Sequence, residues 1–450
     1  MKIGLLLLST LLLVSTAQSQ EALNLNRRKV VELALTNNET YQSALMEKDR
    51  IKGQYLEARA GAFPKLDFSA YYLRNIDLQV SPLVMTNEET GEETRFSVGM
   101  GTAHNYNFGL TLTQPLYAAG KVGAAIKIAK YGFSYTDEGI RASRLTVATM
   151  ADRAYLDALA ARATAEVYRE AERLADSSLA VVEKLYEQGH TSEFDLLRAQ
   201  VTAANRRPDR IAAVNNARLA LDYLRNLLAL PHDVELNLED EIEPVAVPDL
   251  NLDELVIEAQ NNRPDLKQSE ELVNIRDKQI SIEKSGYLPS VDLSSTIGWD
   301  NYANDFSKSQ LGYDYWTRSW NVMVLLKWNI FSGLETTGRT RQARVDYYQS
   351  RLDNSQLKRQ VGLEVREAVS KVEEAGERVE SLGQTVKQAE KSVDIALISY
   401  QNGVGTQLEL LDAQVGLTQA RVNRITAVHD LAVSVTELRQ AVGREWDIKW

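Results

Sequence analysis

The chain has 450 residues, a formal net charge of −11 and no cysteine. The acidic balance disfavours nucleic-acid binding, and the lack of cysteine excludes disulfides and thiol chemistry and predicts no cysteine-linked lipid anchor. Hydrolase, metalloprotease and phosphate-loop motifs are absent, and the 4 histidines show no ligand spacing. We therefore expect no catalytic residues, no cofactor and no metal site.

Residues 1–19 have the pattern of a secretory signal peptide. Lys2 supplies a positive charge, residues 3–14 form an apolar run, and small residues precede a cleavage point near Gln20. The apolar run is too short to cross a bilayer as a helix. No later segment is long and apolar enough to do so.

The rest of the chain is a tandem duplication. The segment Tyr186-Glu-Gln-Gly189, with Leu196-Leu197 behind it, recurs as Tyr400-Gln-Asn-Gly403 with Leu410-Leu411. Each half is therefore one architectural unit. We predict a first repeat over 20–230, an equatorial linker over 231–250, a second repeat over 251–443 and a C-terminal tail, also equatorial, over 444–450.

Each repeat should begin with a helix, 28–62 in the first and 252–286 in the second. After two strands comes a long helix, 121–187 or 335–402, in which apolar residues recur every three or four positions. This spacing is typical of helices packed as in coiled coils. Gly189 and Gly403 then end the long helices, and a shorter helix returns antiparallel to each, over about 192–230 and 406–443.

Residues after Pro64 and Pro289 alternate between apolar and polar side chains, which predicts strands. The four predicted strands lie at 66–72, 106–113, 291–300 and 320–329, and the intervening segments 75–102 and 301–318 should be loops. Strands of about ten residues with aromatic rings near their ends suit an outer-membrane barrel wall. A soluble sheet with one buried face gives the same alternation.

Four strands cannot close a barrel, and an open sheet edge in hydrocarbon leaves backbone groups unpaired. Copies of the chain must therefore complete it. Two copies give eight strands and a filled interior; three give twelve, and a transport role favours three.

The pattern of motifs resembles the TolC-like outer membrane efflux proteins over nearly all of the mature chain. The resemblance rests on the order and duplication of Pro64-x-Leu66, Pro289-x-Val291, the strand exits Leu112–Tyr117 and Leu326–Gly333, and the two helix-hairpin tips. It implies an α+β membrane protein, a homotrimer with a twelve-stranded β-barrel (four strands per chain) continued by a long antiparallel α-helical barrel.

The resemblance also implies function. Such proteins sit in the outer membrane of a Gram-negative bacterium, contact its lipid and extend into the periplasm. They form the passive exit duct of a tripartite efflux or type I secretion system, with a periplasmic adaptor protein and an inner-membrane pump as partners. The alternatives are a cytosolic coiled-coil scaffold or filament, a periplasmic coiled-coil adaptor, and an enzyme. An adaptor would have one helical hairpin rather than two with amphipathic strands.

Matching the family's tip motif to this sequence gives candidate site residues. Glu409 and Asp412 lie three residues apart, so they share one helix face. They match the family's acidic periplasmic constriction, where rings of carboxylates attract cations. The alternative is that they are ordinary solvent-exposed acids of a helix. Asp195 and Tyr400 match a network that closes the tip, but Gly405 stands where the family has a basic residue. The adaptor contact should lie on the two turns, at Gly189, His190, Thr191, Gly403, Val404 and Gly405.

Overall fold

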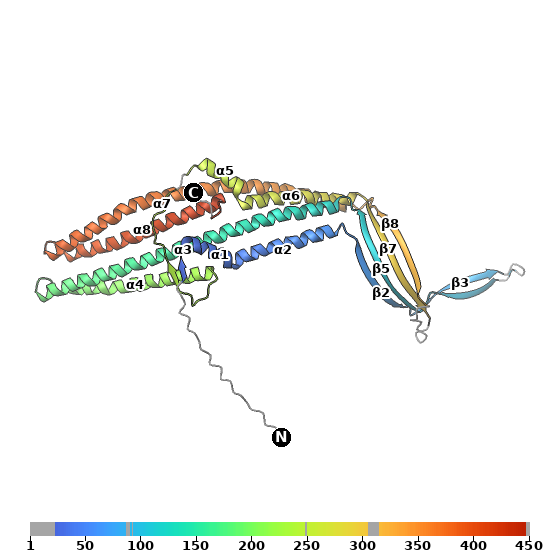
Figure 1. Cartoon of the computed structure of the whole chain (residues 1–450), viewed down its shortest axis with the longest axis horizontal. Coiled ribbons are helices and arrows are strands. Elements are labelled where there is room, and N and C mark those ends of the chain that lie inside the picture. Colours follow the sequence, from blue (N-terminus) through green and yellow to red (C-terminus); the bar gives the residue numbers. More distant parts are fainter. Residues whose placement is uncertain (1–22, 87–90, 92, 248–249, 305–314, 447–450) are drawn as a thin grey trace, which may run out of the picture. The chain divides into compact units, whose positions relative to one another are not determined.

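The computed structural model describes residues 23–86, 91, 93–247, 250–304 and 315–446 (Figure 1). They form two compact units, each assembled from both halves of the chain. Unit 1 comprises residues 1–45, 139–264 and 358–450, and unit 2 comprises residues 46–138 and 265–357. The predicted signal peptide, residues 1–19, lies outside the described residues.

Unit 2 contains a four-stranded antiparallel sheet in the order β2-β5-β7-β8, which confirms the four predicted strands. Their bounds are β2 Lys65–Arg74, β5 His104–Tyr117, β7 Ser290–Ala303 and β8 Thr317–Lys327. The central pair, β5 and β7, joins the two repeats. Gly109 faces Gly298 across this pair, where a Cβ on Gly109 would lie 3.0 Å from the carbonyl oxygen of Ile297.

The two edge strands are open to the surroundings. Among the described strands, β2 and β8 each pair on one side only, and every residue of both strands is exposed. The exposed side chains include large apolar ones, namely Leu66, Phe68, Trp320, Val322 and Val324. A surface of this kind marks contact with a membrane or another protein chain.

The prediction of a loop over residues 75–102 is wrong. This segment holds a two-stranded antiparallel hairpin, β3 (Gln79–Thr86) and β4 (Glu93–Met100). Asn75 closes its base, because its backbone N–H donates to the Ala103 carbonyl at 2.9 Å and its side-chain amide to the Thr102 carbonyl at 2.8 Å. For the second predicted loop, 301–318, β7 continues to Ala303 and β8 begins at Thr317, while residues 305–314 lie outside the described residues.

Each repeat begins with two helices where the sequence predicts one. In the first repeat α1 (Arg27–Asn37) is followed by α2 (Glu39–Ala60); in the second, α5 (Leu252–Asn262) is followed by α6 (Pro264–Lys284). Arg263 is extended because a following proline disfavours the helical conformation. Asn38 is extended as well, and its side-chain oxygen accepts from the Thr40 N–H at 3.0 Å, which caps α2.

Two helical hairpins follow the strands, as predicted. α3 (Lys121–Glu187) turns into α4 (Glu193–Leu227), and α7 (Glu335–Gln401) turns into α8 (Gln407–Val442). The long helices α3 and α7 each contribute to both units.

No helix among the described residues combines the length and the hydropathy needed to cross a bilayer.

The core of unit 1 joins the beginning, middle and end of the chain. The short strand β1 (Leu23–Leu25) pairs in parallel with β6 (Leu236–Leu238), which lies within the predicted linker 231–250. Both pack on buried small and aromatic residues of α3, and Trp446 covers the same cluster. Those α3 residues are Val147, Ala148, Ala151, Ala154, Tyr155, Ala158 and Leu159.

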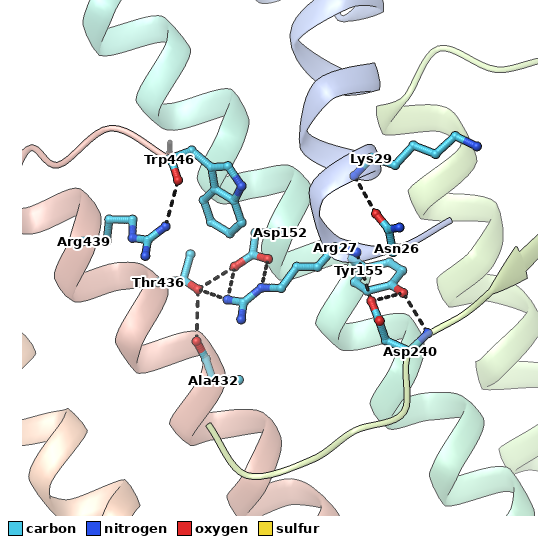
Figure 2. Close-up of polar contacts among 10 residues, drawn as sticks. All are labelled: Asn26, Arg27, Lys29, Asp152, Tyr155, Asp240, Ala432, Thr436, Arg439 and Trp446. Carbon is cyan, nitrogen blue, oxygen red and sulfur yellow. Dashed lines mark hydrogen bonds and ion pairs between the residues drawn. The ribbon is translucent and has the colours of Figure 1, made fainter. Parts of the chain in front are cut away.

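An ion pair lies beside this core (Figure 2). The Arg27 guanidinium at the start of α1 contacts both oxygens of Asp152 on α3, at 2.5 Å and 2.7 Å, and the Thr436 hydroxyl of α8 donates to the same carboxylate at 2.5 Å. The Asp152 side chain is fully buried, whereas that of Arg27 is 33% exposed. Bidentate geometry of this kind is the strong form of a charged hydrogen bond, so three helices distant in sequence are held at one point.

Further contacts extend this Arg27–Asp152 cluster. The Arg27 backbone N–H and the Tyr155 hydroxyl both donate to Asp240, at 3.0 Å and 2.8 Å. The guanidinium groups of Arg27 and Arg439 lie 5.4 Å and 5.0 Å from the centre of the Trp446 ring, within the range of cation–π attraction. Burial and the hydrogen bond to Asp240 raise the pKa of Tyr155, so it remains a neutral donor.

We expect Asp152→Ala to lower the free energy of unfolding of unit 1 by about 2–3 kcal/mol, because it leaves a partly buried guanidinium without its carboxylate. Chemical denaturation followed by circular dichroism would measure the loss. Glu166→Gln, which removes an exposed carboxylate paired with Arg169, is the control and should change stability by less than about 0.5 kcal/mol. Equal losses in both variants would contradict a special role for the cluster.

Candidate functional site

The candidate site lies at the two hairpin tips, which have the same backbone design. Gly189 and Gly403 adopt the left-handed conformation, with φ of 75° and 73°. Their N–H groups donate to the carbonyls of Tyr186 and Tyr400, at 2.9 Å and 3.0 Å. Glycine is needed because other residues are strained at positive φ. This common turn makes the two tips comparable position by position.

The predicted adaptor residues are mostly exposed. Gly189, His190, Gly403 and Val404 are on the surface, and Thr191 and Gly405 are half-buried. Large apolar side chains surround them. On α4 these are Phe194, Leu197 and Val201, and on α8 they are Leu408 and Val415, all exposed. The tips therefore present apolar side chains as well as exposed turn residues.

Glu409 has a structural role at the start of α8. Its carboxylate accepts from the Thr406 N–H at 2.8 Å, and its own N–H donates to the Thr406 hydroxyl at 3.3 Å. This reciprocal pair is a capping box. Asp412 follows on the same face and is exposed. The two predicted gate residues therefore lie together, and both line a groove between α7 and α8 that also contains Lys391.

The first tip has charged residues at the positions that match Glu409 and Asp412, but the sign of the charge differs at the second of them. Asp195, the repeat counterpart of Glu409, accepts hydrogen bonds from the hydroxyls of Ser192 and Thr191 at 2.7 Å and 3.1 Å. The hydrogen bond from Ser192 is the main reason that the pKa of Asp195 is lowered. Arg198 stands where α8 has Asp412. Only the second tip therefore carries two carboxylates on one face.

Tyr400 and Asp195 lie near each other, but no hydrogen bond of normal geometry joins their side chains. Tyr400 is 9% exposed and packs with Val182, Ala199 and Leu410. Its hydroxyl has no hydrogen-bond partner among the described residues, and burial raises its pKa. Within one chain, Tyr400 therefore joins the hairpins by packing.

Two glutamines of α8 make polar links between the hairpins near the tips. The Gln407 side-chain amide donates to the Asp195 backbone carbonyl at 2.9 Å, and the Gln414 amide donates to the Ser178 hydroxyl at 2.7 Å. Both glutamines are buried. Sequence reasoning missed them, although Gln414 belongs to the repeated Ala-Gln pair and lies one heptad after Gln407, which is the spacing of an inward-facing seam.

Gly405 fits the turn as glycine. Its N–H donates to the Ser399 carbonyl at 3.0 Å, and a Cβ at this position would lie 2.9 Å from the Ser399 Cβ. A basic residue here would require the turn to shift. Gly405, which departs from the family pattern, therefore lies in a tight turn where a Cβ would be too close to Ser399.

Metal binding has no support in the part of the chain that the structure describes, where no group of three His, Asp or Glu side chains could hold an ion. Of the histidines, His190 and His232 are exposed. His104 contacts the Tyr72 hydroxyl at 2.7 Å, and His429 lies between two carboxylates.

A duplicated unit of amphipathic strands and a helical hairpin is the architecture of a class of outer-membrane channels. The model of the family "Outer membrane efflux protein" matches residues 30–230 and 255–444, and the chain belongs to this family. It is therefore a protein of the outer membrane with a periplasmic extension, and its family consists of efflux and secretion channels rather than enzymes.

Relatives and solved structures agree with this assignment. The chain is 24% identical to the outer membrane protein TolC of Vibrio cholerae over 65% of this chain and 66% of TolC. It is 22% identical to OprJ of Pseudomonas aeruginosa over 93% and 84% of the two chains. Crystal structures of CusC and of Vibrio cholerae VceC share the fold, each with a TM-score of 0.74. CusC is 20% identical, and the match covers 94% of this chain and 93% of CusC. VceC is 18% identical, and the match covers 94% of this chain and 97% of VceC.

We expect Tyr400→Phe to leave the stability of the tips unchanged or to raise it by up to about 1 kcal/mol, because it removes a buried hydroxyl without a partner. Gln414→Ala should cost about 1–2 kcal/mol, since it removes the buried hydrogen bond that the Ser178 hydroxyl accepts, while that hydroxyl still donates to the Leu174 carbonyl. Hydrogen exchange of peptides covering both tips would measure these changes. A clear loss of protection in Tyr400→Phe would show that its hydroxyl makes a bond that one chain alone does not contain.

Proposed function

We propose that three copies of the chain form the outer-membrane exit duct of a tripartite efflux or type I secretion system. The observation that carries the proposal is the sheet with two unpaired edges. In hydrocarbon each unpaired backbone group costs several kcal/mol, so β8 of one copy must pair with β2 of the next. The strand order β2-β5-β7-β8 alternates in direction, so this pairing continues the antiparallel sheet.

Three copies fit a transport role better than two. Eight strands give a barrel filled by its own side chains, whereas twelve leave room for a lumen. The duct has no energy source of its own in this proposal, and an inner-membrane pump drives cargo through it. The names of two relatives indicate different cargo. CusC of Escherichia coli is a cation efflux protein, and AprF of Pseudomonas aeruginosa is an alkaline protease secretion protein. Such variety supports a passive conduit.

We expect the full-length protein, extracted from outer membranes in mild detergent, to have three times the mass of one chain, and boiling in SDS should reduce it to a single chain. Mass photometry and unheated gels would measure this. The open edges β2 and β8 make a monomer unstable in lipid. A folded monomer that remains in the membrane fraction would contradict the proposal.

The periplasmic gate in this proposal consists of Glu409 and Asp412. Three copies would place six of these carboxylates around the lumen, where they attract cations and exclude anions. Asp195 would help to keep the tip closed because its backbone carbonyl accepts a hydrogen bond from the Gln407 amide. Tyr400 would do so because it packs between the hairpins.

We expect the double variant Glu409→Gln, Asp412→Asn to weaken block of the channel by divalent cations about fivefold, which corresponds to about 1 kcal/mol. Glutamine at position 409 preserves the capping box, so the helix start should persist. Single-channel conductance in planar bilayers would measure the block. Glu377→Gln, on an exposed part of α7 away from the tip, is the matched control. Unchanged block in the double variant would remove the gate assignment.

The adaptor contact in this proposal covers the two turns and the apolar side chains beside them. Phe194 and Val404 are 69% and 83% exposed, and exposed apolar groups of this kind mark protein interfaces. Buried aromatic residues often dominate the binding energy of such contacts.

We expect Phe194→Ser to weaken capture of the purified adaptor by about tenfold or more without changing the mass of the trimer. Phe194→Leu, which keeps an apolar side chain, should lose much less. Surface plasmon resonance would compare the two variants. Equal affinities for wild type and Phe194→Ser would place the contact elsewhere.

A further inference from the structure

His429 of α8 connects the two hairpins of one chain. Its Nε2 atom lies 2.6 Å from a carboxylate oxygen of Asp157 on α3, and its Nδ1 atom lies 3.1 Å from a carboxylate oxygen of Asp430. The imidazole is 19% exposed, so solvent reaches it only in part. It is thus a mostly buried titratable group that none of the roles above uses.

The geometry selects one protonation state of this ring. Ionised carboxylates only accept hydrogen bonds, and a neutral imidazole has a single N–H donor. Both contacts can be hydrogen bonds only when both ring nitrogens carry a proton. In the neutral ring, one nitrogen lone pair would face a carboxylate oxygen. The hydrogen bond to Asp157 is accordingly the main cause of a raised pKa for His429, and burial opposes it.

Charged groups from all four neighbouring helices surround the ring. Asp157 comes from α3, and Asp430 of α8 also contacts Arg378 of α7 at 2.7 Å. Asp209 of α4 lines the same groove as His429, as does Tyr168 of α3. Two carboxylates thus contact the imidazole directly, and within the described part of the chain only Asp430 also pairs with a guanidinium. This balance favours the imidazolium form.

The other polar links between α3 and α8 found among the described residues contain no histidine. They include the Thr436–Asp152 and Gln414–Ser178 hydrogen bonds and the ion pairs of Arg153 with Glu437 and of Arg421 with Glu170. Arginine keeps its charge throughout the physiological range, whereas histidine changes charge within it. Among these links, therefore, only that of His429 can respond to a moderate change of pH.

We propose that His429 and Asp157 form an acid-strengthened clamp that ties α3 to α8, and hence the first hairpin to the second, within each chain. When the ring is protonated, its contact with Asp157 is a charge-assisted hydrogen bond between the two hairpins, and Asp430 accepts from the other ring nitrogen. When the ring is neutral, the contact with Asp157 is no longer an ion pair, so the link between the hairpins is weaker. The sign follows from linkage, because a raised folded-state pKa gives stabilisation that is full in acid and is lost as the pH rises through that pKa.

The test is hydrogen exchange of the full-length protein at about pH 5.5 and about pH 8.5, on either side of the histidine titration. After correction for intrinsic exchange rates, peptides containing Asp157 and His429 should open about two- to fivefold more at the higher pH, as expected for a partly exposed ion pair. His429→Gln should show the larger opening at both pH values. His232→Gln, which changes an exposed histidine away from the hairpin tips, should behave like wild type.

Asp157→Asn gives a second variant that keeps the size of the side chain and removes the charge that favours the imidazolium. It should reduce the pH dependence as His429→Gln does. An unchanged pH dependence in both variants, or tighter association at high pH in wild type, would overturn the proposal. The readout lies within one chain, so it does not depend on whether the protein is an exit duct.

Discussion

The unpaired edges of β2 and β8 are the constraint from which the rest of the molecule follows. A sheet that ends in two open strands leaves backbone groups unpaired in hydrocarbon, and in the proposed trimer other copies continue it. The helices α2, α3, α6 and α7 are the α-helices next to the four strands in the chain. The way in which the strands of the proposed trimer close would therefore also arrange these helices. In the proposed trimer, one requirement of backbone hydrogen bonding determines both the membrane part and the helices of unit 2.

Duplication supplies the framework, and differences between the repeats supply the properties of the site. Both tips end their long helix at a glycine and begin the next helix with a hydroxyl cap, Ser192 or Thr406. Asp195 is followed by Arg198 on its helix face, whereas Glu409 is followed by Asp412. Because the helices end and begin at matching positions in the two tips, this change in charge creates an acidic face on α8 within the same hairpin framework.

The sequence predicted what is encoded locally. The ends of α3 and α7 lie within one residue of the predicted positions, because Gly189 and Gly403 are strong local signals. The hairpin β3–β4 was missed because the acidic sequence 87–93 is typical of a solvated loop, and apolar side chains fall on both faces of β3, such as Val80 and Leu83. The break at Asn38 was missed as well, since no proline marks it.

Contacts between distant residues could not be predicted from one sequence. The Arg27–Asp152 pair joins side chains 125 residues apart, and no periodicity links them. No periodicity links Gln407 with Asp195 either. For the candidate site, the shared face of Glu409 and Asp412 followed from helical spacing, but the capping role of Glu409 depends on the rotamer that its side chain adopts. The predicted roles at the gate, the closed tip and the adaptor contact remain proposals.

The core beside the Arg27–Asp152 cluster has a consequence for biogenesis. Its parts come from residues 23–41, 147–159, 220–242 and Trp446, so α1 packs on segments that are synthesised well after it. Folding that depends on such remote contacts is slow. Until those segments have left the ribosome, α1 has nothing on which to bury its apolar face, and apolar surface exposed in a folding intermediate favours aggregation and the binding of chaperones.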